Sequence, residues 1–225
     1  MLKIDWINHE ASLYACKKFH YSKKIPVNKL AKMGVWEDEK FVGAVIFSCG
    51  SAGCSSYSKT LGIENTQIAE LARVALTDHK TGVTRILRIA LSILKKSMSG
   101  LRVLVSYADR EQGHHGGIYQ GGNWCYVGLS SKDIAFIDKD GKRHHSRNVS
   151  ETGYKVHCGV RAKRPKPSDM EKIIVPPKHK YLMPLDEDMK KQIAHLSKPY
   201  PKRANNQAVA NPATLGGEIP TRTLQ

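Results

Sequence analysis

Apolar and polar residues repeat with two different periods in the first part of the chain. From Thr84 to Met98 apolar side chains recur at helical spacing, with Thr84 placed to cap the helix and Gly100 to stop it. Residues 68–77 alternate with a period of two, which favours a strand although a helix also fits, and residues 101–107 form an apolar run typical of a buried strand. The order strand, polar loop, helix, strand predicts a βαβ unit.

Weaker patterns place the other elements of the core. Residues 5–19 are predicted to form a strand, a turn and a helix, and residues 35–48 a hairpin that turns at 38–40. The segment 49–60 is rich in Gly and Ser, which indicates a mobile loop. One or two strands are expected within 126–137.

The periodicity fades in the last third of the chain, where prolines recur. We therefore expect an α/β fold with a catalytic core over residues 1–150, built on a mixed central sheet flanked by helices. Residues 151–203 are predicted to be an extended basic arm wrapped on that core, with one helix over 186–196. The polar stretch 204–225 has no pattern and is predicted to be disordered.

The formal net charge of +16 is concentrated towards the C-terminus. Residues 139–203 hold 17 Lys and Arg against 7 Asp and Glu, which indicates a surface that contacts phosphates, or alternatively a solubilising basic face. The five cysteines show no disulfide framework and fit reduced thiols. Without an apolar leader or a long apolar run, we expect a cytoplasmic protein and no membrane partner.

The segment 104–128 carries the most distinctive chemistry of the chain. An apolar strand runs into Asp109, a loop of Gly and His follows, and aromatic residues come next: Tyr119, Trp124 and Tyr126. Ligands of open α/β sheets bind outside the carboxyl ends of strands, so this segment predicts the floor and rim of an active site. Asp109 is expected to orient or deprotonate an amine or to bind a metal; the alternative is a helix cap.

These residues resemble a known family. The run ELARVALTDH, the LVSYAD strand, the GHHGGIYQGGNWCYVG segment and the KHKYLMPLD and KPYPKR tail are similar to the phage Mom family over roughly residues 15–203. The resemblance implies a GNAT-like transferase fold and an enzyme that converts adenine in DNA to N6-carbamoylmethyladenine, which protects phage DNA from restriction. A simple acyl transfer would leave an amide on N6, so the CH2 of this product implies a redox, radical or rearrangement step as well.

The resemblance also assigns site residues. A functional His-Tyr pair of the family matches His20 and Tyr21, and its required aspartate matches Asp109; with Tyr119 these are the predicted catalytic residues. Iron has been associated with the family, so His20 and Asp109 are candidate metal ligands, although incomplete for any usual iron site. Each candidate also has a structural alternative. His20 could cap a helix, the aromatic residues could be buried in the core, and His114 and His115 could lie in an exposed loop instead of reaching the substrate. The residues expected to bind donor or substrate are Arg73, Lys80, Gly82, Thr84, Asn123 and Trp124.

The loop before the predicted helix departs from the pattern of ordinary GNAT enzymes. Those enzymes bind the pyrophosphate of coenzyme A with several glycines here, whereas this chain has only Gly82. Use of acetyl-CoA is therefore in doubt, and another activated acyl donor, such as an aminoacyl-tRNA, is the other candidate.

The basic residues are expected to hold double-stranded DNA, because cations replace the counterions of the phosphates. An aromatic pocket beside them would accept an extruded base. Two rival functions stay open: a GNAT N-acetyltransferase that uses acetyl-CoA on a small amine or protein, and a DNA-binding module without catalysis. The oligomeric state is also open, with a homodimer as one option. The predicted DNA-contacting residues are Arg161, Lys163, Arg164, Lys166, Lys178 and Lys180.

Overall fold

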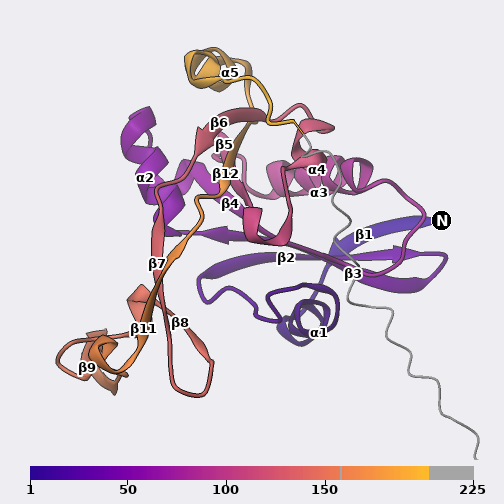
Figure 1. Ribbon diagram of the computed structural model, residues 1–225. Coiled ribbons are helices and arrows are strands. Elements are labelled where there is room, and N and C mark those ends of the chain that lie inside the picture. The colour runs from indigo at the N-terminus through magenta and orange to yellow at the C-terminus, as the bar shows by residue number, and fades with distance from the viewer. Residues whose placement is uncertain (158, 203–225) are drawn as a thin grey trace, which may run out of the picture.

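A mixed sheet of seven strands forms the centre of the protein (Figure 1). The computed structural model describes residues 1–157 and 159–202. All neighbouring strands of this sheet are antiparallel except β4 and β5, which are parallel. In spatial order the strands are β1 (Leu2–Trp6), β2 (Lys29–Glu37), β3 (Lys40–Cys49), β4 (Ile68–Leu76), β5 (Val103–Ala108), β12 (His179–Pro184) and β6 (Cys125–Leu129).

The sheet divides between its two parallel strands. The pairing of β4 with β5 covers only residues 68–70 of β4, and the rest of the strand has no partner on that side. At the same point the register of β4 against β3 shifts by one residue at Ala72, and such a bulge bends a strand away from its neighbour. The C-terminal halves of β4 and β5 therefore form the two sides of a fork.

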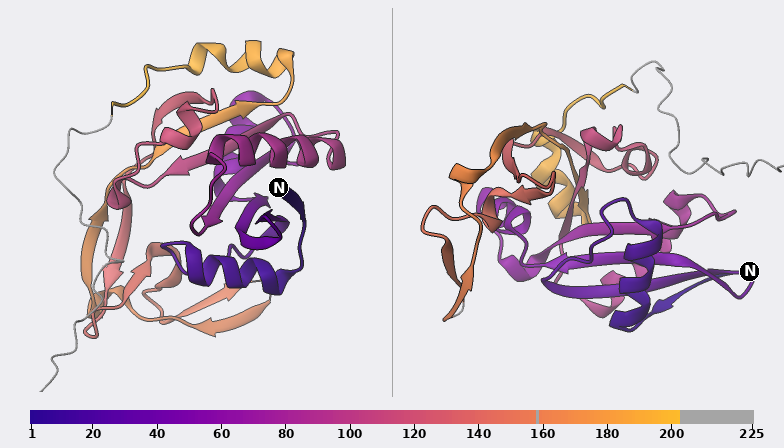
Figure 2. Two further views of the ribbon diagram at one scale, coloured as in Figure 1. Left: turned by 90° about the vertical axis from the view of Figure 1, so that its right-hand side faces the viewer. Right: turned by 60° about the horizontal axis from the view of Figure 1, so that its bottom comes forward.

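Helices cover both faces of the sheet (Figure 2). Helix α3 packs on one face and buries an apolar stripe that includes Ile86, Ala90 and Leu94 in the main core, beside the short helix α4. Helix α1 packs on the opposite face over β3 and β4, and α2 and α5 pack over β4 and β12. The helices are α1 (His9–Phe19), α2 (Ala52–Leu61), α3 (Val83–Ser97), α4 (Gly117–Gln120) and α5 (Glu187–Ile193).

A protrusion of small sheets, residues 131–177, leaves the central sheet after β6 and returns to it at β12 (Figures 1 and 2). Its strands are β7 (Asp133–Ile137), β8 (Arg143–His145), β9 (Tyr154–His157), β10 (Val160–Lys163) and β11 (Glu171–Val175). Strands β11, β7 and β8 form one sheet, whereas β9 and β10 form a separate two-stranded ribbon. Short 3-10 helices of one turn each complete the described residues: η1 (Asn65–Gln67), η2 (Arg110–Gln112), η3 (Ser146–Asn148), η4 (Pro167–Asp169) and η5 (Ala194–Leu196).

The predicted α/β class and the mixed central sheet flanked by helices are confirmed. The βαβ unit is present as β4, α3 and β5, although α3 begins at Val83 and its N-cap is Gly82 instead of the expected Thr84. The predicted loop over 49–60 is wrong, because α2 occupies most of it. Ser51 caps this helix by accepting the Cys54 N–H, and the buried spacing of Cys54, Tyr57 and Leu61 fixes it on the sheet.

The segment predicted as an extended arm folds partly into the core. Strand β12 lies between β5 and β6, so the arm supplies an inner strand of the central sheet, and α5 confirms the helix expected near its end. The prediction for 204–225 lies outside the described residues. Cys16, Cys49, Cys54 and Cys125 are free thiols. Among the described residues no helix combines the length and apolar character that a membrane crossing needs.

Candidate functional site

The fork between β4 and β5 opens into a cleft of about 1570 Å³. Its sides come from both strands of the fork, from the loop after α1, from the loop between β5 and α4, and from the root of the protrusion. Of the predicted site residues, six line it: His20, Tyr21, Arg73, Asp109, Tyr119 and Lys178. Segments far apart in the sequence therefore meet at one site.

Asp109 follows β5 directly and is the most enclosed charged group of the site, with its residue 8% exposed. One carboxylate oxygen accepts the N–H of Glu111 at 3.1 Å, so the expected helix cap is present at η2. The other oxygen, Oδ2, lies 3.0 Å from Lys178 Nζ and 3.4 Å from the Tyr21 hydroxyl. Asp109 is therefore both a cap and a carboxylate that faces the cleft between two donors.

Tyr21 is 46% exposed and leans on neighbouring rings. Its ring centroid lies 4.3 Å from that of His20 and 5.8 Å from that of His114. Burial of its hydroxyl, together with the adjacent Asp109 charge, raises the pKa of Tyr21 to about 12. At neutral pH the hydroxyl keeps its proton and donates to Asp109.

His20 ends α1 and lies against the cleft with 9% of its surface exposed. Burial, followed by the charges of Arg73, His114 and Lys23, lowers its pKa from 6.5 to about 4, so the ring is neutral at pH 7. The Ser22 N–H donates to Nδ1 at 3.1 Å. Since Nδ1 accepts, the neutral ring carries its proton on Nε2, an arrangement that favours a hydrogen-bond donor over a base.

Tyr119 lies at the floor of the cleft but is 7% exposed and belongs to the core. Ser106 Oγ is 2.8 Å from both the Leu71 carbonyl oxygen and the Tyr119 hydroxyl. Ser106 has one proton and a carbonyl only accepts, so Tyr119 donates its proton to Ser106. Burial raises the pKa of Tyr119 to about 12, and this geometry favours support of the floor over proton transfer.

Trp124, one of the residues predicted to bind donor or substrate, lies in the core instead of at the cleft surface. Trp124 is 1% exposed and packs against the Tyr119 ring at 5.2 Å, within the main core. Asn123 is exposed in the turn before β6 with φ of +59°. Neither residue is among those that line the cleft.

The predicted donor loop is held by a carboxylate that the sequence did not single out. Glu37, at the end of β2, accepts the N–H groups of Lys80 and Thr81 at 2.6 and 2.7 Å. A hydrogen bond from the Thr81 side chain, together with these two backbone bonds, holds the pKa of Glu37 below its ordinary value. The two N–H groups are therefore already used, and Lys80, Gly82 and Thr84 do not line the cleft.

Arg73 lies on the free side of β4 and lines the cleft. Its Nε donates to the Lys24 carbonyl at 3.2 Å and its Nη1 to the Ala72 carbonyl at 2.6 Å. The guanidinium thus joins the bulge of β4 to the loop that follows His20. The His-rich loop is adjacent, since His114 and His115 also line the cleft.

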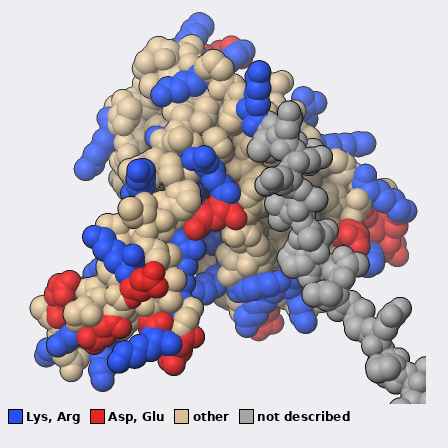
Figure 3. Space-filling view, in the orientation of Figure 1, with Lys and Arg blue, Asp and Glu red and all other residues tan. Residues whose placement is uncertain are grey.

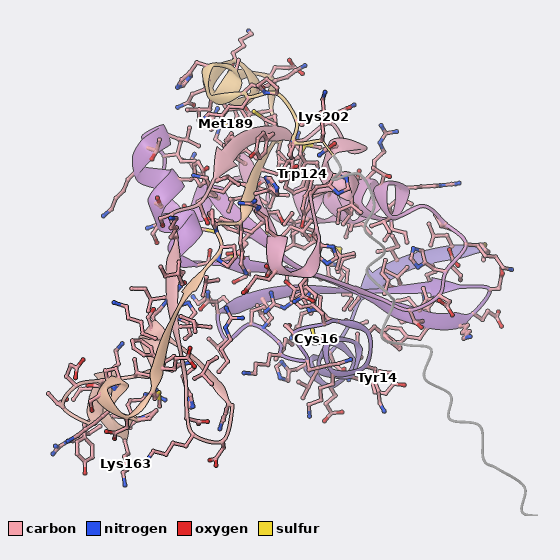
Figure 4. The ribbon with its side chains drawn as sticks, viewed as in Figure 1. Tyr14, Cys16, Trp124, Lys163, Met189 and Lys202 are labelled. Atoms are coloured by element: carbon pink, nitrogen blue, oxygen red, sulfur yellow. The ribbon has the colours of Figure 1, made fainter. Side chains whose placement is uncertain are left out.

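The predicted DNA-contacting residues fall into three places. Lys178 is at the cleft, whereas Lys180 is on the other face of the sheet with its Nζ 5.6 Å from the Tyr57 ring. The remaining four, residues 161–166, belong to or follow the ribbon, and Lys163 lies at the end of the protrusion (Figure 4). On the face drawn in Figure 3, basic side chains spread over the body and protrusion, with acidic ones interspersed near its end.

Sequence reasoning missed three cationic residues that the protrusion adds to the cleft lining: Lys132, Arg143 and Arg147. Arg143 Nη2 pairs with Glu111 at 3.0 Å, which fixes the protrusion to the loop after Asp109. The excess of positive charge after residue 139 was visible in the sequence. The sequence did not show that the protrusion places some of these cations beside the cleft.

The predicted metal site does not fit the residues present. Within residues 1–157 and 159–202, no group of three or more His, Cys, Asp and Glu side chains is placed to hold a metal ion. Nδ1 of His20 is occupied by Ser22, and Oδ2 of Asp109 is occupied by Lys178. An iron centre normally needs several such ligands, so we assign no step to a metal.

Comparison with known protein families gives a match over nearly all of the described chain. The model of the Mom protein family matches residues 1–202. Among curated proteins, the methylcarbamoylase mom of Escherichia phage Mu is 26% identical over 128 residues, which are 56% of this chain and 52% of that protein. The chain thus spans about half the length of this curated relative.

Solved structures give only distant matches. An IAA acetyltransferase from Bacillus cereus has a TM-score of 0.44 and 14% identity, covering 82% of this chain and 100% of that one. A Bacillus subtilis acetyltransferase in complex with CoA has a TM-score of 0.43 and 13% identity, covering 83% of this chain and 100% of that one. Similarities at this level carry no functional inference.

Proposed function

We propose that this chain, which belongs to the Mom protein family, is a transferase that modifies adenine in DNA at N6. The expected product is N6-carbamoylmethyladenine, formed in the cytoplasm of the bacterial host, where it would protect phage DNA from restriction. One observation carries the proposal: the Asp109 carboxylate lies in a cleft lined by cations from the protrusion. A carboxylate suits an exocyclic amine, and the cations suit the phosphates beside it.

Duplex DNA would approach the open side of the cleft. Arg143, Arg147 and Lys132 would contact phosphates on the strand that carries the target. The adenine would leave the base stack and enter the cleft, since N6 of a stacked base is out of reach of a group as enclosed as Asp109. A volume of about 1570 Å³ leaves room for the base and a donor together.

Asp109 would accept a hydrogen of the N6 amine and orient its lone pair towards the acyl carbon of the donor. The N6–C bond would form as the bond between the acyl group and its leaving group breaks, and the leaving group would depart with the amine proton. This transfer leaves an amide on N6; with an aminoacetyl donor that amide is an isomer of N6-carbamoylmethyladenine, so a rearrangement that needs no oxidant would complete the product.

Lys178 and Tyr21 would hold the carboxylate in place from the other side, because both contact Oδ2. His20 would donate from Nε2 to the carbonyl oxygen of the donor. Tyr119 would keep the floor rigid through Ser106.

The donor is proposed to be an activated acyl compound placed along the unpaired side of β4, near Arg73. Acetyl-CoA has less support than a donor without a diphosphate, such as an aminoacyl-tRNA. The reason is electrostatic, since Glu37 holds the N–H groups of Lys80 and Thr81 just before α3, and its charge there repels an anion.

The proposal is tested by nucleoside mass spectrometry on DNA from cells that express the wild-type chain, Asp109→Asn or Asp140→Asn. Asp140 is an exposed acid on the protrusion and serves as the matched control. Wild type and the control should yield carbamoylmethyladenine, while Asp109→Asn should lower it by about 100-fold or more and still bind duplex DNA.

Unmodified adenine alone from soluble, abundant wild-type protein would refute the proposal. Release of CoA from acetyl-CoA in the presence of a small amine, without modified adenine, would instead favour the acetyltransferase alternative. Equal product from Asp109→Asn and wild type would remove the carboxylate from the mechanism.

A further inference from the structure

The β9–β10 ribbon stands apart from every other sheet in the described residues. Its four residue pairs join only these two strands. Ser150 and Gly153 anchor its base, since the Ser150 N–H donates to the Pro165 carbonyl at 3.1 Å and the Arg164 N–H to the Gly153 carbonyl at 2.8 Å. The ribbon is therefore a braced finger at the end of the protrusion (Figure 4).

The two faces of the ribbon differ in character. Side chains of paired residues share a face, so Val156 and Arg161 lie together with Tyr154 and Lys163. The opposite face carries Lys155, Val160 and Ala162, and we call it the inner face because Lys155 Nζ donates to the Arg147 carbonyl at 2.9 Å. Thus the outer face combines apolar and cationic side chains, while the inner face connects to a residue that lines the cleft.

The outer face is unusually apolar for an exposed finger. Val156 is 65% exposed and Tyr154 is 43% exposed. The Arg161 guanidinium lies 4.1 Å from the Tyr154 ring centroid, and this contact holds the cation on the same face. Exposed methyl groups beside oriented cations are the combination that contacts base edges and backbone together in a DNA groove.

Size decides which groove fits. Two paired strands are about 4.8 Å apart, and with side chains their ribbon approaches the roughly 12 Å width of the major groove. The minor groove, at roughly 6 Å, is too narrow for it. Four residues per strand extend about 13 Å, enough to reach the base edges.

We propose that the outer face of the β9–β10 ribbon inserts into the major groove of duplex DNA and senses the sequence beside the target adenine. The proposal rests on DNA being the substrate, as proposed above. Arg161 would bond to a purine edge, Val156 would contact base methyl groups, and Lys163 would contact a phosphate. Charge complementarity supports this partner, since residues 150–170 hold five Lys and Arg against two Asp and Glu.

Dimethyl sulfate footprinting separates the two grooves, because the reagent methylates guanine N7 in the major groove and adenine N3 in the minor groove. The variants are Val156→Ala and Arg161→Ala, and Lys172→Ala on β11 is the matched control, exposed on the same protrusion. Wild type and Lys172→Ala should protect guanine N7 beside the target. Both ribbon variants should lose that protection and bind duplex about 5-fold or more weakly, with less preference between sequences.

Three results would overturn the inference: protection of adenine N3 instead of guanine N7, ribbon variants that bind like wild type, or a dimer in light scattering that Val156→Ala converts to a monomer. The last would assign the face to a second copy of the chain. Nucleoside analysis of the wild type in parallel keeps the two proposals separate. Ribbon-dependent N7 protection without modified adenine would leave the groove contact standing and refute the enzymatic function.

Discussion

Replacement of His20 by Asn should remove a pH-dependent loss of stability from the protein. The folded state lowers the pKa of His20 from 6.5 to about 4, because the ring is buried beside Arg73 and other cations. Asn keeps an oxygen that can accept the Ser22 N–H, the bond that Nδ1 accepts in the wild type. The substitution therefore removes the titration while retaining the local hydrogen bond.

The sign follows from which state binds the proton. Between pH 6.5 and about 4 the unfolded chain holds a proton on His20 that the folded chain does not, so stability falls as the pH falls through this window. For a shift of this size the loss between about pH 7.5 and pH 5 is roughly 2 kcal/mol. One edge of the ring faces the open cleft, so solvent screening reduces the expected value to about 1 kcal/mol.

Urea unfolding of wild type, His20→Asn and His9→Asn at several pH values measures this difference. His9 is an exposed histidine at the other end of α1 and controls for the loss of any histidine. On acidification, the free energy of unfolding should decrease in all three proteins. The decrease should be about 1 kcal/mol smaller for His20→Asn than for the wild type and His9→Asn. Parallel curves for all three would refute the neutral, buried state assigned to His20.

Two further substitutions test the geometry of the site. Tyr21→Phe should lower the yield of modified adenine by about 10-fold, because Asp109 loses a hydrogen-bond donor. It should change the free energy of unfolding by under about 0.5 kcal/mol, since the ring is 46% exposed. An unchanged yield in nucleoside analysis would contradict this prediction. Gly116→Ala should lower the free energy of unfolding, measured by urea unfolding, by more than about 2 kcal/mol. The reason is that φ is +89° and the new Cβ would lie 2.4 Å from the Tyr181 ring. A variant as stable as the wild type would show that this ring can move.

Local periodicity was enough to predict α3 and β5, but it left β4, the other side of the fork, open between a strand and a helix. Helix α3 has a continuous apolar stripe and β5 a continuous apolar run, and both patterns are specific to their elements. Asp109 followed from the same logic, since it is the first polar residue beyond β5. A candidate site at the end of β5 could therefore be proposed before any tertiary contact was known.

Tertiary packing decided the elements that were missed. Helix α2 has serines and a glycine that favour a loop, and only the burial of Cys54, Tyr57 and Leu61 on the sheet selects the helix. Strand β12 is short and flanked by prolines, so its pattern resembles an extended arm until β5 and β6 enclose it. Trp124 lies in the core, which the sequence could not distinguish from a pocket, because an aromatic residue near a glycine loop fits both equally well.

Lys178 gives the cleft and the protrusion a shared fixed point. Its backbone N–H donates to Ser130 Oγ at 2.9 Å and its carbonyl accepts the Ser130 N–H at 2.8 Å, which joins the two chain segments where the protrusion meets the sheet. Its Nζ reaches Asp109 from this same junction. Because one residue fixes both, DNA held by the protrusion and a base held at Asp109 would keep a constant relative position. A basic surface attached by a flexible linker would raise local DNA concentration but would not set that position.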